Sequence, residues 1–216
     1  MINLITSFFF SKISHHAIAD RNKELQTCLQ KNLENNLIEK IHLFVDDDIA
    51  LKYIMKLNNP KINVISVGIK PLYSDLFGYA INNLQGKICM VSNSDIYIYE
   101  CDINVLNKIN EPDTVFSLTR YEHDLSCPFI DSYGGSHDCF IFKSPLNSEL
   151  LKHIAHPQNL WNSEGVVLYE LQRINIKIYN PCFQIKIVHL HKSEIREDDR
   201  YTYGDDRRCF IYPIRL

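Results

Sequence analysis

The sequence predicts an α/β fold, in which a central, mostly parallel and twisted sheet is flanked by helices. Apolar runs of strand length alternate with helical patterns through the first half of the chain, which is the order typical of parallel sheets. These runs are continuously apolar, as expected for strands that are covered on both faces. The 216 residues suffice for a sizeable core, and we expect one domain over residues 1–216.

The first half of the chain contains four predicted strands and three predicted helices. The opening run, MINLITSFFF, has no basic region before it and no small-residue cleavage site, so we interpret it as a buried strand and not as a signal peptide. An apolar stripe at helical spacing identifies the first helix, with its members at Leu25, Cys28, Leu29 and Leu33. The strands are expected over residues 2–10, 40–45, 62–67 and 87–92, and the helices over 21–36, 49–57 and within 71–84.

The second half of the chain changes character, because its short strands are separated by polar loops. A helix is expected within residues 161–173. The segment 194–208 is dense in charge and is expected to be a mobile surface segment. Strands are expected over 114–119, 138–142, 176–179 and 185–191, and residues 209–214 are expected to return as an edge strand.

Composition and charge argue against several classes of function. The net charge of −3 argues against binding nucleic acid through a basic surface. The seven cysteines are odd in number and scattered, with no C-x-x-C pair, which favours a reduced compartment over a disulfide framework. Because no apolar run reaches the roughly 18 residues of a membrane span, we expect a soluble, cytoplasmic protein.

The segment KICMVSNSDIYIY places a carboxylate at the end of a predicted buried strand. The apolar run 88–91 is followed by small polar residues and then by Asp95. Ligands of open α/β sheets lie beyond the carboxyl ends of the strands, so Asp95 would lie where a hard cation and its phosphate ligand bind. The alternative is that residues 93–95 form only a turn.

Two histidines near the end of the chain are the other candidate metal ligands. His189 and His191 are two residues apart in a predicted strand, so both imidazoles can point to one side. With Asp95 and the oxygens of a diphosphate, one of them would complete a site suited to Mn²⁺ or Mg²⁺. The alternatives are ordinary structural histidines, or a zinc site with Cys182 that lacks a second cysteine at ligand spacing.

Bound phosphate would need a metal and cationic side chains in this chain. No glycine precedes Gly68, which excludes a P-loop or a dinucleotide fingerprint after the first strand. Lys192 and Arg196 follow the two histidines and could hold a leaving diphosphate. The alternative is that both belong to the charges of a solvated tail.

Two further acids are candidates for catalysis. Asp138 follows paired glycines in YGGSHD, which allow a ligand to approach the backbone closely, and it could accept hydrogen bonds from sugar hydroxyls. Glu164 follows Asn162 and Ser163 at the start of a predicted helix and could be a general base. The alternatives are a glycine turn for the first segment and helix capping for the second.

Taken in order, these segments resemble the GT-A-fold nucleotide-sugar glycosyltransferases. The chain is similar in particular to small glycosyltransferase domains encoded by large DNA viruses, such as a chlorella virus domain implicated in capsid-protein glycosylation. The resemblance covers roughly residues 1–196, and its most specific segments are NSDIY, GSHDCFIFKSP and IKIVHLHKS in that order. It implies a GT-A-like domain with a nucleotide-binding half over about 1–100 and a sugar and acceptor half over about 101–216.

The resemblance also implies roles for individual residues. Asn93 and Asp95 match an Asp-x-Asp motif with its first acid replaced, so that Asp95 binds the metal and Asn93 the ribose or a metal-bound water. His189 or His191 matches the late histidine of the metal site, and spacing does not decide which. The nucleotide would be contacted by Thr6, Ser7 and Phe8 at the base and ribose, and by Asp46 at the uracil edge. Asp138 matches a donor-sugar contact, and Glu164 an acid near the acceptor.

These observations predict a metal-dependent glycosyltransferase. It would move a sugar from a nucleotide-sugar donor, expected to be a UDP-sugar, to a glycan or glycoprotein acceptor such as a viral capsid glycan, in the host cytoplasm if the protein is viral. Mn²⁺ or Mg²⁺ is the expected cofactor. The alternatives are a nucleotidyltransferase acting on sugar phosphates, which would be expected to carry a glycine-rich loop after the first strand, and a non-catalytic binding module.

Overall fold

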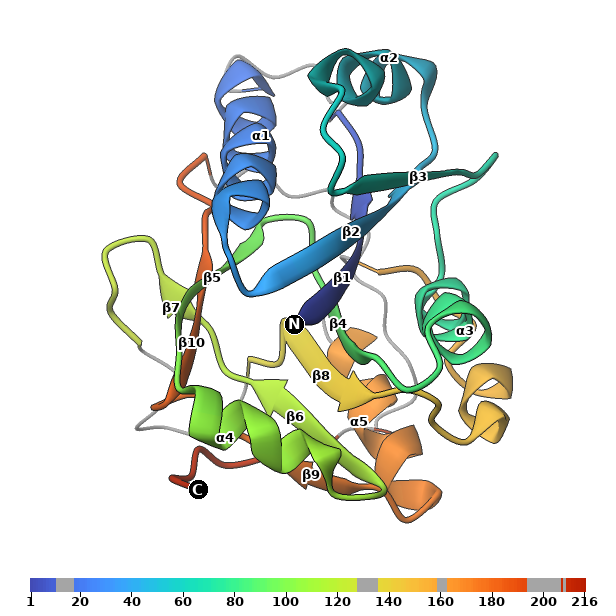
Figure 1. The fold of residues 1–216 in the computed structure, drawn as a ribbon, viewed down its shortest axis with the longest axis vertical. Coiled ribbons are helices and arrows are strands. Elements are labelled where there is room, and N and C mark those ends of the chain that lie inside the picture. The colour runs from blue at the N-terminus through green and yellow to red at the C-terminus, as the bar shows by residue number, and fades with distance from the viewer. Residues whose placement is uncertain (11–17, 128–135, 159–162, 194–206, 208) are drawn as a thin grey trace.

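The computed structural model describes residues 1–10, 18–127, 136–158, 163–193, 207 and 209–216. Its main feature is a seven-stranded twisted sheet (Figure 1). In spatial order the strands are β3 (Ile62–Ser66), β2 (Ile38–Val45), β1 (Ile2–Phe8), β4 (Ile88–Ser92), β8 (Cys139–Lys143), β6 (Thr114–Leu118) and β9 (Lys177–Tyr179).

The sheet is mostly parallel, as the sequence predicted. β8 is the one strand that runs against its neighbours, because it pairs antiparallel with both β4 and β6 while the other neighbouring pairs are parallel. From β1 the chain proceeds outward through β2 to β3, and then returns to place β4 on the other side of β1. This reversal of direction is the kind of switch point at which open α/β sheets bind ligands, beyond the carboxyl ends of β1 and β4.

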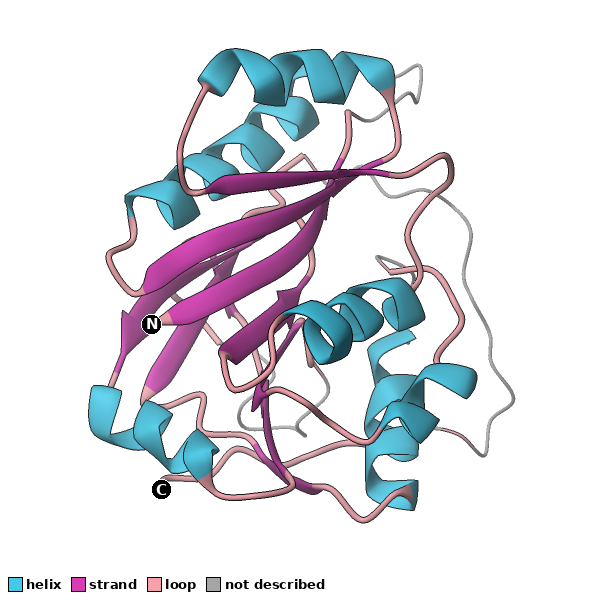
Figure 2. Ribbon diagram, turned by 45° about the vertical axis from the view of Figure 1, so that its right-hand side comes forward, coloured by secondary structure: helices cyan, strands magenta, loops and turns pink. Residues whose placement is uncertain are grey.

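Helices cover both faces of the sheet (Figure 2). Successive strand residues alternate between two cores: Leu4 and Met90 belong to one, and Ile5 and Val91 to the other. Burial on both faces explains the continuous apolar runs of the sequence. The first core includes residues of α1 (Ile18–Glu34), α2 (Asp48–Leu57) and α4 (Ile103–Asn107), and the second those of α3 (Tyr73–Asn83), the 3₁₀ helix η2 (Ser148–Lys152) and α5 (Ser163–Arg173).

A smaller sheet of three strands lies beside the main one. Its order is β5 (Ile96–Cys101), β10 (Ile185–His189), β7 (Tyr121–Glu122), with β10 antiparallel to β5 and parallel to β7. Asn32 of α1 joins this sheet to the helix layer, since its amide donates to the carbonyl of Ile96 and accepts from the amide of Ile98. β10, the last of the described strands, is the central strand of this smaller sheet.

The structure differs from the sequence predictions in several places. Residues 209–214 form no edge strand but a single bridge between Asn180 and Pro213, because proline cannot donate to a ladder. The first helix begins at Ile18 and not at residue 21. β5, β7, α4 and η2 were not predicted, and the strand expected over 185–191 ends at His189. The charged segment 194–206 lies outside the described residues. Among the described helices, none is both long and apolar enough to cross a membrane.

A buried histidine links the first three strands. Nε2 of His42 in β2 lies 3.2 Å from Oδ1 of Asn3, and its Nδ1 lies 3.2 Å from Nδ2 of Asn63. Because the Asn63 amide donates, Nδ1 of the ring accepts and the ring is neutral. Burial, with a smaller contribution from Lys40, lowers the pKa of His42 to about 4.

We expect His42 to make the fold sensitive to acid. The unfolded chain takes up this proton near pH 6.5 and the folded chain only near pH 4, so stability is full above about pH 6.5 and falls by about 2 kcal/mol as the pH approaches 4. Urea unfolding at pH 7 and pH 4.5 measures the loss. His42→Gln should reduce it and His123→Gln, at an exposed position, should not; an equal loss in His42→Gln and the wild type would contradict this assignment.

Candidate metal and donor site

Buried polar residues gather beyond the carboxyl ends of β1 and β4. The four residues Ser92 to Asp95 end β4 and form the turn that follows it, and all four are buried. β8 runs the opposite way, so its beginning lies at the same edge as the end of β4. The amide of Asn93 donates to the carbonyl of Asp138, 3.1 Å away, which joins the turn to the residue that precedes β8.

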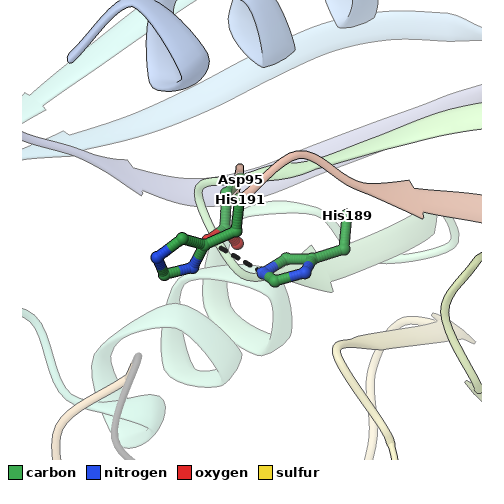
Figure 3. Close-up of side chains that lie close together, drawn as sticks. All are labelled: Asp95, His189 and His191. Carbon is green, nitrogen blue, oxygen red and sulfur yellow. Dashed lines mark hydrogen bonds and ion pairs between the residues drawn. The ribbon is translucent and has the colours of Figure 1, made fainter. Parts of the chain in front are cut away.

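The structure brings Asp95, His189 and His191 together (Figure 3). Nε2 of His189 lies 3.2 Å from Oδ2 of Asp95, and Nδ1 of His191 lies 3.6 Å from the same oxygen. The three potential ligand atoms all lie within 4.8 Å of one another. β10 positions the histidines, because its terminal residue His189 pairs with the start of β5 and the amide of Leu190 donates to the carbonyl of Asp95.

Charged neighbours surround this cluster. Nη2 of Arg21 lies 2.6 Å from Oδ2 of Asp95, and Nδ1 of His189 lies 3.4 Å from Glu122. Burial alone would raise the pKa of Asp95, but His189 and Arg21 outweigh it and hold that pKa well below its usual range. Burial likewise lowers the pKa of His189, and the carboxylates of Asp95 and Glu122 overcome it and raise it to about 9.

These residues fit a divalent cation. Two imidazole nitrogens beside a carboxylate oxygen form a mixed donor set, which suits Mn²⁺ better than the all-oxygen sites typical of Mg²⁺. Oδ1 of Asn93, two residues before Asp95, is buried and has no hydrogen-bond partner among the described residues, so an acceptor is available for a ligand. A ligating imidazole is neutral, so cation binding here would release the proton of His189.

A second pair of acids lies on the other side of Asn93. Its Nδ2 donates to Oδ1 of Asp138 over 3.2 Å and to Oε1 of Glu164 over 3.0 Å. Glu164 stands in the first turn of α5, and the hydroxyl of the buried Tyr73 lies 3.4 Å from the same oxygen. Burial of the carboxylate, followed by repulsion from Asp138, raises the pKa of Glu164 to about 7. Such a group can accept a proton near neutral pH.

Arg120 holds Asp138 in place. Its Nη1 lies 3.2 and 3.3 Å from the two carboxylate oxygens of Asp138, and its Nε donates to Glu122 over 3.0 Å. The hydroxyl of Ser136 also donates to Asp138. Arg120 thus connects the metal cluster, through Glu122 and His189, to the acid pair.

The hydroxyl groups at the end of β1 contact the turn that follows β4. Thr6 donates to the carbonyl of Ser92 over 2.9 Å, and the hydroxyl of Ser7 lies 2.8 Å from that of Ser94. Ser7 also donates to Gln158 over 3.1 Å. The side chain of Phe8 points into the core, where it is 2% exposed and stacks on Tyr53 of α2.

The structure leaves two of the sequence-predicted site residues, Asp46 and Lys192, apart from these clusters. Asp46 directly follows β2 and is half-buried. Its neighbour Asp47 caps α2, because its carboxylate accepts from the backbone amide of Ala50. The side chain of Lys192 is exposed, and its backbone amide donates to Glu24. Arg196 lies outside the described residues.

Sequence reasoning missed several residues that contact the site. Arg21 carried a usable signal, because it precedes Leu25 by four residues and Cys28 by seven and therefore lies on the buried face of the helix. An arginine on such a face requires a carboxylate partner. The other missed residues carried no local signal, since their partners are far away in the chain: Tyr73, Arg120, Glu122 and Gln158.

Comparison with known proteins identifies the fold. No protein-family model and no curated protein matches the sequence. The mannosyltransferase PcManGT from Pyrobaculum calidifontis, solved in complex with GDP-Man and Mn²⁺, gives a TM-score of 0.53 at 9% identity over 88% of this chain and 56% of its own. S. aureus TarS gives a TM-score of 0.53 at 12% identity over 89% of this chain and 37% of its own, and its 1–349 form 0.51 at 12% over 88% and 58%.

At such identities the likeness concerns the fold alone. It confirms the predicted GT-A-like α/β architecture, with a mostly parallel central sheet between helices. This chain spans less than three fifths of the length of each of these structures. The resemblance to viral domains stays a prediction.

Proposed function

We propose that this protein is a metal-dependent glycosyltransferase that uses a nucleotide-sugar donor. The observation that carries the proposal is the position of the Asp95, His189 and His191 cluster. It lies where the sheet reverses direction, and Asn93 stands between it and the acid pair. The shared fold with a mannosyltransferase solved with GDP-Man and Mn²⁺ supports the same class of reaction.

Asp95, His189 and His191 would hold the cation, for which Mn²⁺ is the first choice and Mg²⁺ the second. Such a cation stabilises negative charge on the diphosphate that leaves the sugar. Lys192 and Arg196, which follow the histidines, are proposed to contribute positive charge to the same diphosphate.

The nucleotide would lie along the ends of β1 and β2. The unpartnered oxygen of Asn93 is available to a ribose hydroxyl. Thr6, Ser7 and the backbone of Phe8, whose side chain is buried in the core, are proposed to form the wall against base and ribose. Asp46, which follows β2, is proposed to accept from the imide N–H of uracil. An acid there favours a UDP-sugar as donor.

Asp138 and Glu164 would serve the sugar and the acceptor. Asp138, fixed by Arg120, can accept hydrogen bonds from sugar hydroxyls. Glu164, with its pKa raised to about 7 by burial and by Asp138, would take the proton from the attacking hydroxyl of the acceptor, as a transfer with inversion requires. If the transfer retains configuration, no base is needed and the acids would stabilise positive charge on the sugar.

The remaining assignments follow from these roles. Residues of about 1–100 would bind the nucleotide, and residues of about 101–216 the sugar and acceptor, within one domain. The acceptor is proposed to be a glycan or glycoprotein, a viral capsid glycan among them, and the place of action the cytoplasm, which would be that of the host if the protein is viral.

A nucleotide screen tests the donor. We expect UDP with Mn²⁺ to raise the melting temperature by about 5 °C or more at a hundredfold excess over Kd, because ligand at that excess adds about 2.7 kcal/mol to the stability of the folded chain. GDP with Mn²⁺ is the matched comparison, and each nucleotide with EDTA is the control. A larger shift with GDP would exclude the uridine assignment. No shift with either would favour a binding module, and release of pyrophosphate from a nucleoside triphosphate a nucleotidyltransferase.

A further inference from the structure

Three cationic or imidazole groups lie close to one carboxylate oxygen of Asp95. Nη2 of Arg21 lies 2.6 Å from Oδ2, nearer than Nε2 of His189 at 3.2 Å and Nδ1 of His191 at 3.6 Å. The side chains of Arg21 and Asp95 are only 10% and 9% exposed, so water screens their attraction little. The guanidinium thus stands at the oxygen through which Asp95 faces both imidazoles.

Arg21 has a second carboxylate within reach. Its Nη1 lies 3.2 Å from Oε2 of Glu24, one turn further along α1. Glu24 is itself fixed, because its oxygens accept from the amides of Lys192 and Ser193 at 2.7 and 2.8 Å and from the Ser193 hydroxyl at 2.9 Å. Glu24 is therefore a rigid acceptor, held by the segment that directly follows the two histidines.

A divalent cation and the Arg21 guanidinium cannot both occupy this oxygen at short distance. Two positive charges a few ångströms apart repel strongly where little water is present. We infer that Arg21 is a positioning residue that occupies Asp95 in place of the cation, and that Glu24 retains the guanidinium when the cation is bound. This inference rests on the metal site of the proposed function.

Binding of Mn²⁺ in the absence of nucleotide tests the inference without any need for turnover. Isothermal titration, checked by the electron paramagnetic resonance of free Mn²⁺, gives the affinity. Arg21→Met removes the competing charge and should bind Mn²⁺ about tenfold more tightly than the wild type, the size of one charged hydrogen bond. Glu24→Gln keeps the shape and an acceptor oxygen but removes the second carboxylate, so Arg21 stays on Asp95 and Mn²⁺ should bind about threefold more weakly.

Competition between Arg21 and the cation predicts that the affinity for Mn²⁺ rises in Arg21→Met and falls in Glu24→Gln. General damage to the fold would lower the affinity in both variants. Arg173→Met, a matched change at a largely exposed arginine of α5, should leave the affinity unchanged. Equal or weaker binding by Arg21→Met, or equal or tighter binding by Glu24→Gln, would overturn the inference. If Arg21→Met does not fold, Arg21→Gln, which also removes the charge but keeps hydrogen-bonding groups, takes its place with the same expected tighter binding.

Asp95→Asn separates this inference from the proposed function. Loss of Mn²⁺ binding in Asp95→Asn together with unchanged affinity in Arg21→Met would remove the role of Arg21 and leave the metal site standing. Undiminished Mn²⁺ binding in Asp95→Asn would overturn the metal site, and this inference with it.

Discussion

Glu164→Gln is expected to slow sugar transfer by about 10²- to 10⁴-fold, the range that a general base contributes. Glutamine preserves the shape of the side chain and an oxygen for the Asn93 amide, but it cannot take a proton from the acceptor. Release of the nucleoside diphosphate under saturating donor measures the rate. The melting-temperature shift with nucleotide and Mn²⁺ should be retained, because Glu164 does not contact the metal cluster.

Glu149→Gln is the matched control, since the side chain of Glu149 is 41% exposed and, among the described residues, its carboxylate pairs with its neighbours Lys152 and His153. Its rate should equal that of the wild type. Glu164→Gln with a rate within about twofold of the wild type would refute the role of Glu164 as base.

The same carboxylate is expected to set the pH dependence of transfer. Burial, and then the charge of Asp138, raises the pKa of Glu164 to about 7. The base acts when deprotonated, so kcat/KM should be level above about pH 7 and fall about tenfold per unit below it. Asp138→Asn removes the neighbouring charge and should move the midpoint to lower pH, whatever it does to the rate itself. An unmoved midpoint in Asp138→Asn would contradict the proposed coupling.

Asp95→Asn is expected to abolish both sugar transfer and the Mn²⁺-dependent part of nucleotide binding. The amide that replaces the carboxylate binds a divalent cation weakly, and it leaves the charges of Arg21 and His189 without their shared partner. Breaking a buried pair in this way costs about 3–5 kcal/mol of stability. Melting temperatures with nucleotide, with and without Mn²⁺, measure the binding, and urea unfolding measures the stability separately.

Asp113→Asn is the control for this change. Asp113 is exposed and has a positive φ of 54°, which asparagine also tolerates, so neither quantity should change. Retention of the Mn²⁺-dependent temperature shift by a folded Asp95→Asn variant would exclude Asp95 as the metal ligand.

The central sheet could be predicted from the sequence because burial on both faces makes each strand a continuous apolar run. β1, β2, β3 and β4 lie where those runs are, within a few residues at their ends. β7 has only two residues and α4 only five, which is too short for a periodic signal. Residues 209–214 are apolar enough for a strand, but the side chain of Asn180 binds the carbonyl of Ile211 and Pro213 limits the ladder.

The sequence predicted the site residues whose positions follow from the ends of nearby strands, and it missed those whose partners are distant in the chain. Asp95 follows the end of β4 and precedes β5, and His189 ends β10, which pairs with β5, so their convergence required only that pairing. His191 joins them from two residues beyond the end of β10. The ion pair between Arg21 and Asp95 spans 74 residues, and nothing local in either segment specifies the other. The same holds for Arg120, which is brought to Asp138 by the pairing of β6 with β8.

The order β5, β10, β7 has a consequence for how the protein is made. On the ribosome, β5 and β7 emerge long before the strand that joins them, so this sheet cannot close until residues 185–189 have left the exit tunnel. The nascent polypeptide therefore has no complete imidazole pair at Asp95 until residue 191 has been synthesised and has left the tunnel. A transcript truncated before residue 185 would yield a product with the edge of β5 unpaired, which is a template for aggregation.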